Sequence, residues 1–303
     1  MGGSRKKILI AIMTICLIAF AVSGGIAVYR AVVKHNAFKE YMRLSKLADT
    51  EEMGVSEETG AAASGEEASG DEDPGDNISE EPAVGGQESE EEDQPKLSDI
   101  PGVDISLRDP DWDELKGIND DVYAWLYVPG TNVDYPVVEH ETEYDFYLMH
   151  NLDKSYGYPG CVYSRPYVDK DMSDPMTILY GHNMGNGTMF ATLHEYEDAE
   201  FFENNKFVYV YLPDRVIVYE IFAAYAHNDE DLDYHYNFFD PIVMKDYLDG
   251  VLMNRDMNAH IRRDTEFTGE DHILTLSTCV WHRPELRWLI QAVKIGEESL
   301  ENT

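Results

Sequence analysis

From about residue 105 onward, the chain is divided into short apolar runs that are separated by turn residues such as Pro129 and Gly130. These runs have the length and the β-branched and aromatic content of β-strands. Eight short strands with few helices favour a closed β-barrel, because closure removes exposed strand edges. We therefore predict an all-β domain with strands at 124–128, 133–138, 160–163, 176–180, 207–212, 216–226, 273–279 and 288–295.

Helical spacing precedes and interrupts this series of strands. Residues 111–125 carry large apolar side chains three or four positions apart, which predicts short N-terminal helices. A second helix is predicted over 188–193. The third is predicted over 241–253, where Val243, Tyr247 and Val251 share one face. This third helix would form an insertion between two late strands of the barrel.

The N-terminus has the pattern of a membrane anchor. Arg5, Lys6 and Lys7 precede an uncharged apolar run over residues 8–29. At 1.5 Å per residue, this run forms a helix about 33 Å long, enough to cross a hydrocarbon core of about 30 Å. A cleaved signal peptide, with a small-residue site at 21–23, is the alternative. The length of the run favours a retained helix.

An acidic segment separates the predicted anchor from the predicted barrel. Residues 51–95 contain 17 Asp and Glu residues and no basic or aromatic residue. Such a segment has too little apolar surface to offset the entropy of ordering. We expect the chain to cross the cell membrane once, with its folded domain outside the cell. The predicted parts are a cytoplasmic N-terminus (1–7), a transmembrane helix (8–29), a basic stalk (30–48), an acidic disordered linker (49–104) and a folded domain (105–303).

The charge of the chain constrains its partners. The formal net charge is −36, and the predicted folded domain is itself net negative. A surface this negative repels nucleic acid. The expected partners are therefore cationic, amine-bearing or neutral.

Three cysteines raise the question of a disulfide. Cys16 lies inside the apolar run and is expected to be a small membrane residue. Cys161 and Cys279 both fall in the exported domain, where a disulfide between them is chemically permitted. The competing interpretation is one reactive cysteine and one buried thiol. The motifs around Cys279 favour this second interpretation.

Cys279 ends an apolar strand, at residues 273–279. A cysteine at a strand end is held rigidly and can still project into a cleft, as a nucleophile must. Because the thiolate is the attacking species, a nearby base or cation should stabilise it. A buried core cysteine is the commoner fate of an isolated thiol, so Cys279 alone does not establish catalysis.

Two further residues complete a candidate catalytic set with Cys279. His182 follows the strand at 176–180 and suits proton transfer; His282 is the local competitor, in a segment that indicates a surface turn. Arg287 lies eight residues after Cys279, and a hairpin of that length could return it beside the thiol. Its guanidinium could then stabilise an oxyanion. Arg283 is the alternative for this role.

Taken together, these pieces resemble the sortase family, and specifically its class B. The resemblance covers most of residues 110–296, and the order and spacing of the motifs make it specific. The helix predicted at 241–253 is similar to the helical insertion that distinguishes class B. The matching motifs lie at 118–126, 131–137, 145–148, 180–184 (Tyr-Gly-His-Asn-Met), 187–190 and 275–279 (Thr-Leu-Ser-Thr-Cys).

The resemblance implies a cysteine transpeptidase. Cys279 would attack the carbonyl of a threonine in the C-terminal sorting motif of an exported protein, forming a thioacyl enzyme. An amine of a peptidoglycan peptide or its precursor would then resolve this intermediate. His182 would transfer protons, and Arg287 would stabilise the oxyanion. The residues expected to contact substrate are Thr278, Ser277 and Asn183.

The resemblance implies no metal and no organic cofactor. Asp169, Asp171 and Asp174 could suggest a Ca²⁺ site, but solvated loop carboxylates are the favoured interpretation. Two other enzymatic functions could use the same residues. A pilin-polymerising sortase differs only in its amine acceptor, and a papain-type cysteine hydrolase uses water as the acceptor. The position of His182 upstream of Cys279 argues against the papain-type topology. A wall-binding module without catalysis is the non-enzymatic alternative.

Overall fold

The computed structural model describes Gly25, Val32, Lys39, Arg43, residues 46–48 and residues 96–300. Within these ranges, no helix is both long enough and apolar enough to span a membrane. The anchor predicted at 8–29 lies outside the described residues, apart from Gly25. Most of the predicted stalk and linker lie outside them as well.

Eight strands form the predicted closed barrel. In chain order, the strands of the described domain are β1 (Val122–Val128), β2 (Val133–Glu139), β3 (Val162–Ser164), β4 (Met176–Tyr180), β5 (Phe207–Tyr211), β6 (Arg215–Asn228), β7 (His260–Ile261), β8 (Ile273–Val280) and β9 (Arg283–Ser299). The order around the ring is β5-β1-β2-β3-β4-β8-β9-β6, and pairing of β5 with β6 closes it. The short strand β7 is attached to β6 outside this ring, and no sequence pattern predicted it.

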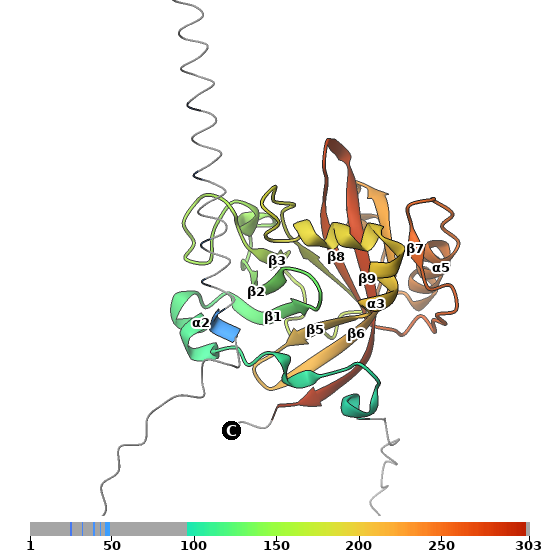
Figure 1. The fold of residues 1–303 in the computed structure, drawn as a ribbon, viewed down its shortest axis with the longest axis horizontal. Helices are drawn as coiled ribbons and strands as arrows, with labels where there is room; N and C mark the ends of the chain where they lie inside the picture. The colour runs from blue at the N-terminus through green and yellow to red at the C-terminus, as the bar shows by residue number, and fades with distance from the viewer. Residues whose placement is uncertain are drawn as a thin grey trace, which may run out of the picture.

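The helices lie outside the barrel, with α2 and α5 on opposite sides (Figure 1). The α-helices of the domain are α2 (Trp112–Ile118), α3 (Ala199–Asn204), α4 (Leu232–His235) and α5 (Pro241–Leu252). Short 3-10 helices are η3 (Leu97–Asp99), η4 (Ile105–Leu107), η5 (Phe146–Leu148) and η6 (Ala191–Glu197). The helical insertion predicted at 241–253 is thus confirmed as α5. The helix predicted at 188–193 occurs slightly later, as η6.

The helical prediction over 111–125 was wrong for its second half. Helix α2 ends at Ile118, and Val122 and Trp125 belong to strand β1. Six of the seven residues of β1 are buried. Because a strand buried on both faces carries apolar residues at most positions, some of them fall three residues apart by chance and imitate a helical pattern.

The ordered domain begins before the predicted boundary at Ile105. Leu97 is buried and belongs to the main hydrophobic core. A Cβ atom at Gly296 of β9 would lie 2.8 Å from the Leu97 side chain, so the two segments are in close contact. Residues 96–104, at the end of the predicted linker, therefore pack on the barrel.

Two hydrophobic clusters stabilise the domain. The larger cluster fills the barrel. The smaller one lies between α5 and the outer face of the sheet formed by β4, β6, β8 and β9. Asp240 caps α5 by accepting a hydrogen bond from the Ile242 amide, and Pro241 occupies its first turn. The buried face of α5 consists of Met244, Tyr247, Leu248 and Val251.

A buried polar network ties α5 to the sheet. The Gln291 amide of β9 donates to Tyr247 of α5 at 2.9 Å and to Thr275 of β8 at 3.0 Å. The Tyr225 hydroxyl of β6 donates to the side-chain oxygen Oε1 of Gln291 at 3.1 Å. Because each buried polar group in this network has a partner, the network fixes the position of α5 relative to the strands.

Candidate active site

The position of Cys279 follows from the alternation of side chains along β8. Leu274 and Leu276 belong to the core inside the barrel, whereas Ile273 belongs to the outer cluster. Since side chains two residues apart share a face, Ser277 and Cys279 point to the outer face with Ile273. Helix α5 does not cover the end of β8, and the Cys279 thiol is exposed.

Arg287 is the direct cross-strand neighbour of Cys279. The β8–β9 register pairs Cys279 with Arg287, and side chains that oppose each other in an antiparallel pair lie on the same face about 5 Å apart. The Arg287 Nη1 atom donates to the carbonyl oxygens of Pro284 at 2.9 Å and Leu286 at 3.0 Å. These bonds hold the guanidinium against the carbonyl groups at the turn of the hairpin.

The competing arginine lies elsewhere. Arg283 pairs in register with Val280, beyond the irregularity that separates Cys279 from Val280. Its Nε atom forms an ion pair with Glu285 at 2.7 Å, and its side chain is 59% exposed. The hairpin therefore brings Arg287 opposite the cysteine and leaves Arg283 in the solvated turn.

His182 lies level with Cys279 on the other side of β8. The parallel β4–β8 register ends with Tyr180 opposite Ser277. The Gly181 amide extends this register beyond the strand by donating to the Ser277 carbonyl oxygen at 3.2 Å. Counting two residues on from the Tyr180–Ser277 pair brings His182 opposite Cys279. The Asn183 side-chain amide then donates to the Cys279 carbonyl oxygen at 2.9 Å. The backbone positions of His182 and Arg287 thus lie on either side of Cys279.

The environment of His182 favours a neutral imidazole. Its Nε2 atom lies 2.7 Å from the Leu148 carbonyl oxygen. Because a carbonyl oxygen only accepts, Nε2 carries the hydrogen and Nδ1 is left as the basic nitrogen. Burial lowers the pKa of His182 below its ordinary value of 6.5, although the hydrogen bond to Leu148 opposes this shift. At neutral pH the ring can therefore accept a proton.

We expect the acidic limb of the kcat/KM profile to have its midpoint below pH 6.5, the ordinary histidine value. Activity requires His182 in a form that can exchange its proton with the thiol, and its lowered pKa delays inactivating protonation until the pH falls further. The test is kcat/KM for peptide cleavage measured between about pH 4 and 9. A midpoint above pH 6.5 would contradict the assignment of this titration to His182. So would a midpoint that shifts in the His194→Gln variant.

A second histidine, His194 of η6, contacts the backbone at Cys279. Its Nε2 atom lies 3.1 Å from the Cys279 carbonyl oxygen and its Nδ1 atom 2.6 Å from Glu197. Both partners are acceptors, so both bonds form only when both ring nitrogens carry hydrogen. Its ring also stacks on Trp288, with centroids 5.7 Å apart. Sequence analysis missed His194; its spacing of three residues from Glu197 was the one available signal.

The predicted substrate-contacting residues have different surroundings. Ser277 lines a small cavity together with Tyr180, Arg287 and the loop that follows β6. Thr278 faces the opposite side of β8 and donates its hydroxyl to the Gly181 carbonyl oxygen at 2.8 Å. Asn183 uses its amide on the Cys279 carbonyl. Of the three, Ser277 is the one that borders the cavity beside Arg287, with a side chain that is 6% exposed.

Comparison with known proteins identifies the family. The sequence model of the sortase domain family matches residues 126–295, which is more than half of the chain. The chain belongs to the sortase family. Its closed barrel and its exposed cysteine at the end of β8 agree with the predictions made from the strand pattern and from the position of Cys279 at a strand end.

The relatives of this sortase are of class B. Sortase B of Listeria monocytogenes is 32% identical over 170 residues, which are 55% of this chain and 65% of the relative. Sortase B of Staphylococcus aureus is 28% identical over 170 residues, 56% of this chain and 68% of the relative. The match thus spans slightly less than two thirds of the length of the Listeria protein.

Solved structures give the same class. Sortase B of Clostridium perfringens has a TM-score of 0.55 and 32% identity, covering 61% of this chain and 99% of that structure. The Staphylococcus aureus sortase B–substrate complex has a TM-score of 0.53 and 26% identity, covering 60% and 83%. The resemblance to class B, stated from the motifs alone, is confirmed.

Close packing holds the His182 segment of the sortase domain. A Cβ atom at Gly181 would lie 2.7 Å from the ring of Phe190, which is fully buried. The Phe190 amide also donates to the His182 carbonyl oxygen at 2.9 Å. Glycine is therefore required at position 181, because a larger residue would displace the ring that supports the histidine.

The two cysteines of the sortase domain are not joined to each other. Cys279 is a free, exposed thiol, whereas Cys161 is buried and its Sγ atom lies 3.5 Å from the His150 carbonyl oxygen. This agrees with the interpretation of one accessible and one buried thiol.

The aspartates at 169–174 act within their own loop. Asp174 accepts a hydrogen bond from the Asp169 amide at 2.8 Å, and Asp171 accepts one from the Ser173 amide at 3.1 Å. In the part of the chain that the structure describes, no group of three or more acidic, His or Cys residues is arranged to hold a metal ion. These carboxylates shape the turn that leads into β4.

Proposed function

We propose that this sortase is a membrane-anchored cysteine transpeptidase of the cell surface, with residues 8–29 as its anchor. It cleaves a C-terminal sorting motif of an exported protein after threonine and transfers the protein to an amine of a cell-wall peptide. The observation that carries this proposal is the row formed by His182, Cys279 and Arg287 across neighbouring strands, around an exposed thiol. A base, a nucleophile and an oxyanion donor are the groups that acyl transfer requires.

In the first half-reaction, the thiol proton of Cys279 passes to His182 and the sulfur attacks the threonine carbonyl carbon. As the C–S bond forms, the carbonyl electron pair moves to oxygen, and the Arg287 guanidinium donates hydrogen bonds to this oxyanion. When the carbonyl re-forms, the C–N bond breaks and His182 gives its proton to the leaving amine. The products are a thioester on Cys279 and a free C-terminal peptide.

The second half-reaction reverses these roles. The acceptor amine attacks the thioester carbon while His182 removes one of its protons. Arg287 again stabilises the oxyanion, and collapse of the intermediate breaks the C–S bond. The Cys279 thiolate leaves and recovers the proton from His182. An amide bond to the acceptor has replaced the original peptide bond, and the enzyme is unchanged.

The charge of the chain supports an amine acceptor over water. The formal net charge is −36, and Asp229, Glu230 and Asp231 line the small cavity that contains Arg287. A negative field raises the local concentration of ammonium groups. A pilin-polymerising sortase would use the same chemistry with a lysine of another subunit as the acceptor.

The amine dependence of the products tests this proposal against the papain-type hydrolase. The full-length chain in detergent is incubated with a cleavable sorting-motif peptide and increasing concentrations of a short peptide that has a free amino terminus. We expect ligated product to increase at the expense of hydrolysed product, because both arise from one thioester. Cleavage with a product distribution that the amine does not change would identify a hydrolase.

A further inference from the structure

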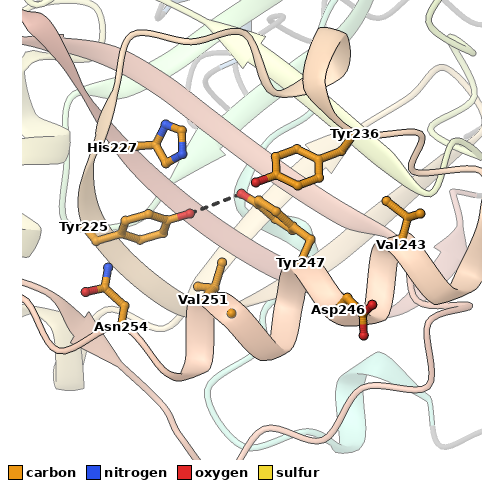
Figure 2. Close-up of a pocket in the computed structure, with 9 residues that line it drawn as sticks. Tyr225, His227, Tyr236, Val243, Asp246, Tyr247, Val251 and Asn254 are labelled. Atoms are coloured by element: carbon orange, nitrogen blue, oxygen red, sulfur yellow. Dashed lines mark hydrogen bonds between the residues drawn. The ribbon is translucent and has the colours of Figure 1, made fainter.

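A second, larger cavity lies beside the active site. Its volume is about 580 Å³, it is open to solvent, and it is lined by residues of β6, of α5 and of the segments that adjoin α5. Figure 2 shows Tyr225 and His227 on the strand and Tyr247 on the helix, with the Tyr225 and Tyr247 hydroxyls hydrogen-bonded to each other at 3.2 Å. The polar residues that line this tyrosine cavity are Tyr225, His227, Tyr236, Asp246, Tyr247 and Asn254.

The sheet connects the tyrosine cavity to the nucleophile. Cys279 pairs with Arg287 across β8 and β9, and Arg287 pairs with His227 across β9 and β6. These three side chains form one row on the outer face, and at about 4.8 Å per strand His227 is about 10 Å from Cys279. His227 lines both the small cavity at Arg287 and the tyrosine cavity. A substrate can therefore reach from one into the other.

Two acceptors of the tyrosine cavity lie outside the Gln291 network, which engages the Tyr225 and Tyr247 hydroxyls. His227 Nδ1 lies 2.9 Å from the Asn228 carbonyl oxygen, so Nδ1 carries the hydrogen and Nε2 is left as an acceptor in the neutral ring. Asp246 contributes a carboxylate. No lysine or arginine is among the described residues that line the cavity. This surface complements a group that has several hydrogen-bond donors and a positive charge.

The tyrosine rings provide the remaining surface. The Tyr236 and Tyr247 rings lie 4.9 Å apart, and Tyr236 is 38% exposed. Burial raises the pKa of Tyr247 to about 12, so its hydroxyl stays neutral. The faces of such electron-rich rings attract ammonium and guanidinium groups. Aromatic rings beside a single carboxylate favour a basic side chain over an acidic or apolar one.

We propose that the tyrosine cavity is a subsite for a lysine or arginine side chain of the exported protein, a few residues before the bond that is cleaved. This inference rests on the proposed transpeptidase function. His182, which protonates the leaving amine, lies on the β4 side of Cys279, whereas the cavity lies on the opposite side, beyond Arg287. The segment that remains attached to the enzyme is therefore the one that extends toward the cavity.

The distances fit this assignment. An extended chain advances about 3.3 Å per residue, so about three residues cover the 10 Å from Cys279 to His227. The cavity continues from His227 toward α5. The fifth and sixth residues before the cleaved bond, just ahead of the four-residue sorting motif, are thus in position to place a long side chain between Tyr236 and Asp246.

Paired donor peptides test the subsite on the full-length chain in detergent. Each pair shares a sorting motif and differs in having lysine or glutamine at one of these positions. We expect kcat/KM to be about tenfold higher for the lysine peptide, as for a partly exposed cation–π contact combined with an ion pair to the carboxylate. The difference should lie in KM, because the subsite binds ground state and transition state alike. In Asp246→Asn and Tyr236→Leu variants, the preference should fall to threefold or less, about the range left by general charge attraction.

Asp249→Asn is the matched control. Asp249 is on the same helix, but it forms an ion pair with Lys245 at 3.0 Å and does not line the cavity. This variant should keep the preference for lysine. An equal loss of the lysine preference in Asp246→Asn and Asp249→Asn would overturn the subsite. A preference for lysine in the acceptor peptide and not in the donor peptide would overturn it as well. Equal rates for both donor peptides, with the thioester still formed, would overturn the subsite alone; failure of every peptide to form a thioester would overturn the proposed function.

Discussion

Replacement of Cys279 with alanine is expected to lower the turnover of sorting-motif peptides by about 10⁴-fold or more. Without the sulfur no thioester can form, and His182 and Arg287 then have no intermediate to act on. Because the Cys279 side chain is exposed, the variant should unfold at nearly the same temperature as the native chain. Initial rates of peptide cleavage, measured together with thermal unfolding, check this expectation.

The control for this experiment is Cys161→Ala. Cys161 is 6% exposed and belongs to the core, so its loss should cost about 1 kcal/mol of stability by creating a small cavity. Cleavage activity at 25 °C should stay within about twofold of native, since it has no part in the transfer. Substantial turnover by Cys279→Ala, or loss of activity in Cys161→Ala without unfolding, would place the nucleophile elsewhere.

Replacement of Arg287 with alanine should lower kcat/KM by about 10² to 10³-fold, as the removal of an oxyanion donor does in other acyl-transfer enzymes. Arg283→Ala should leave kcat/KM within about threefold of native, because the exposed ion pair of Arg283 with Glu285 contributes little. Stopped-time cleavage assays on both variants provide the comparison. Arg287→Lys should recover only part of the activity, because an ammonium lacks the planar fork of a guanidinium.

A different pattern in these variants would change the assignment. A large loss in Arg283→Ala with near-native activity in Arg287→Ala would transfer the oxyanion role to the turn. It would also mean that the hairpin rearranges when substrate binds, because the register shown here places Arg283 opposite Val280.

The strands were predictable because their signals are local. Each run of β-branched and aromatic residues between turns corresponds to one strand of the barrel, and α5 follows from its apolar spacing and from Pro241 in its first turn. Strand β7 has two residues, too few for any period to be visible. Its pairing with β6 depends on where the preceding α5 and its loop return the chain, which no local pattern specifies.

The candidate site was predictable to the extent that it lies at strand ends. The alternation along β8 also separates Ser277, which faces outward with Cys279, from Thr278, which faces the barrel, and the sequence analysis did not use this difference. The contact of His194 with the Cys279 carbonyl joins residues 85 positions apart. Such a contact depends on how η6 packs against β9, and the sequence holds no local signal for it.

The central claim is that Cys279 carries the acyl group. The most direct measurement is mass spectrometry of the full-length chain after reaction with peptides that bear Asn-Pro-x-Thr and Leu-Pro-x-Thr motifs, with and without an added amine. We predict a thioacyl adduct that maps to Cys279 and that the amine converts to ligated peptide. Absence of an adduct on Cys279 with every peptide, or an adduct that maps to another residue, would contradict this account.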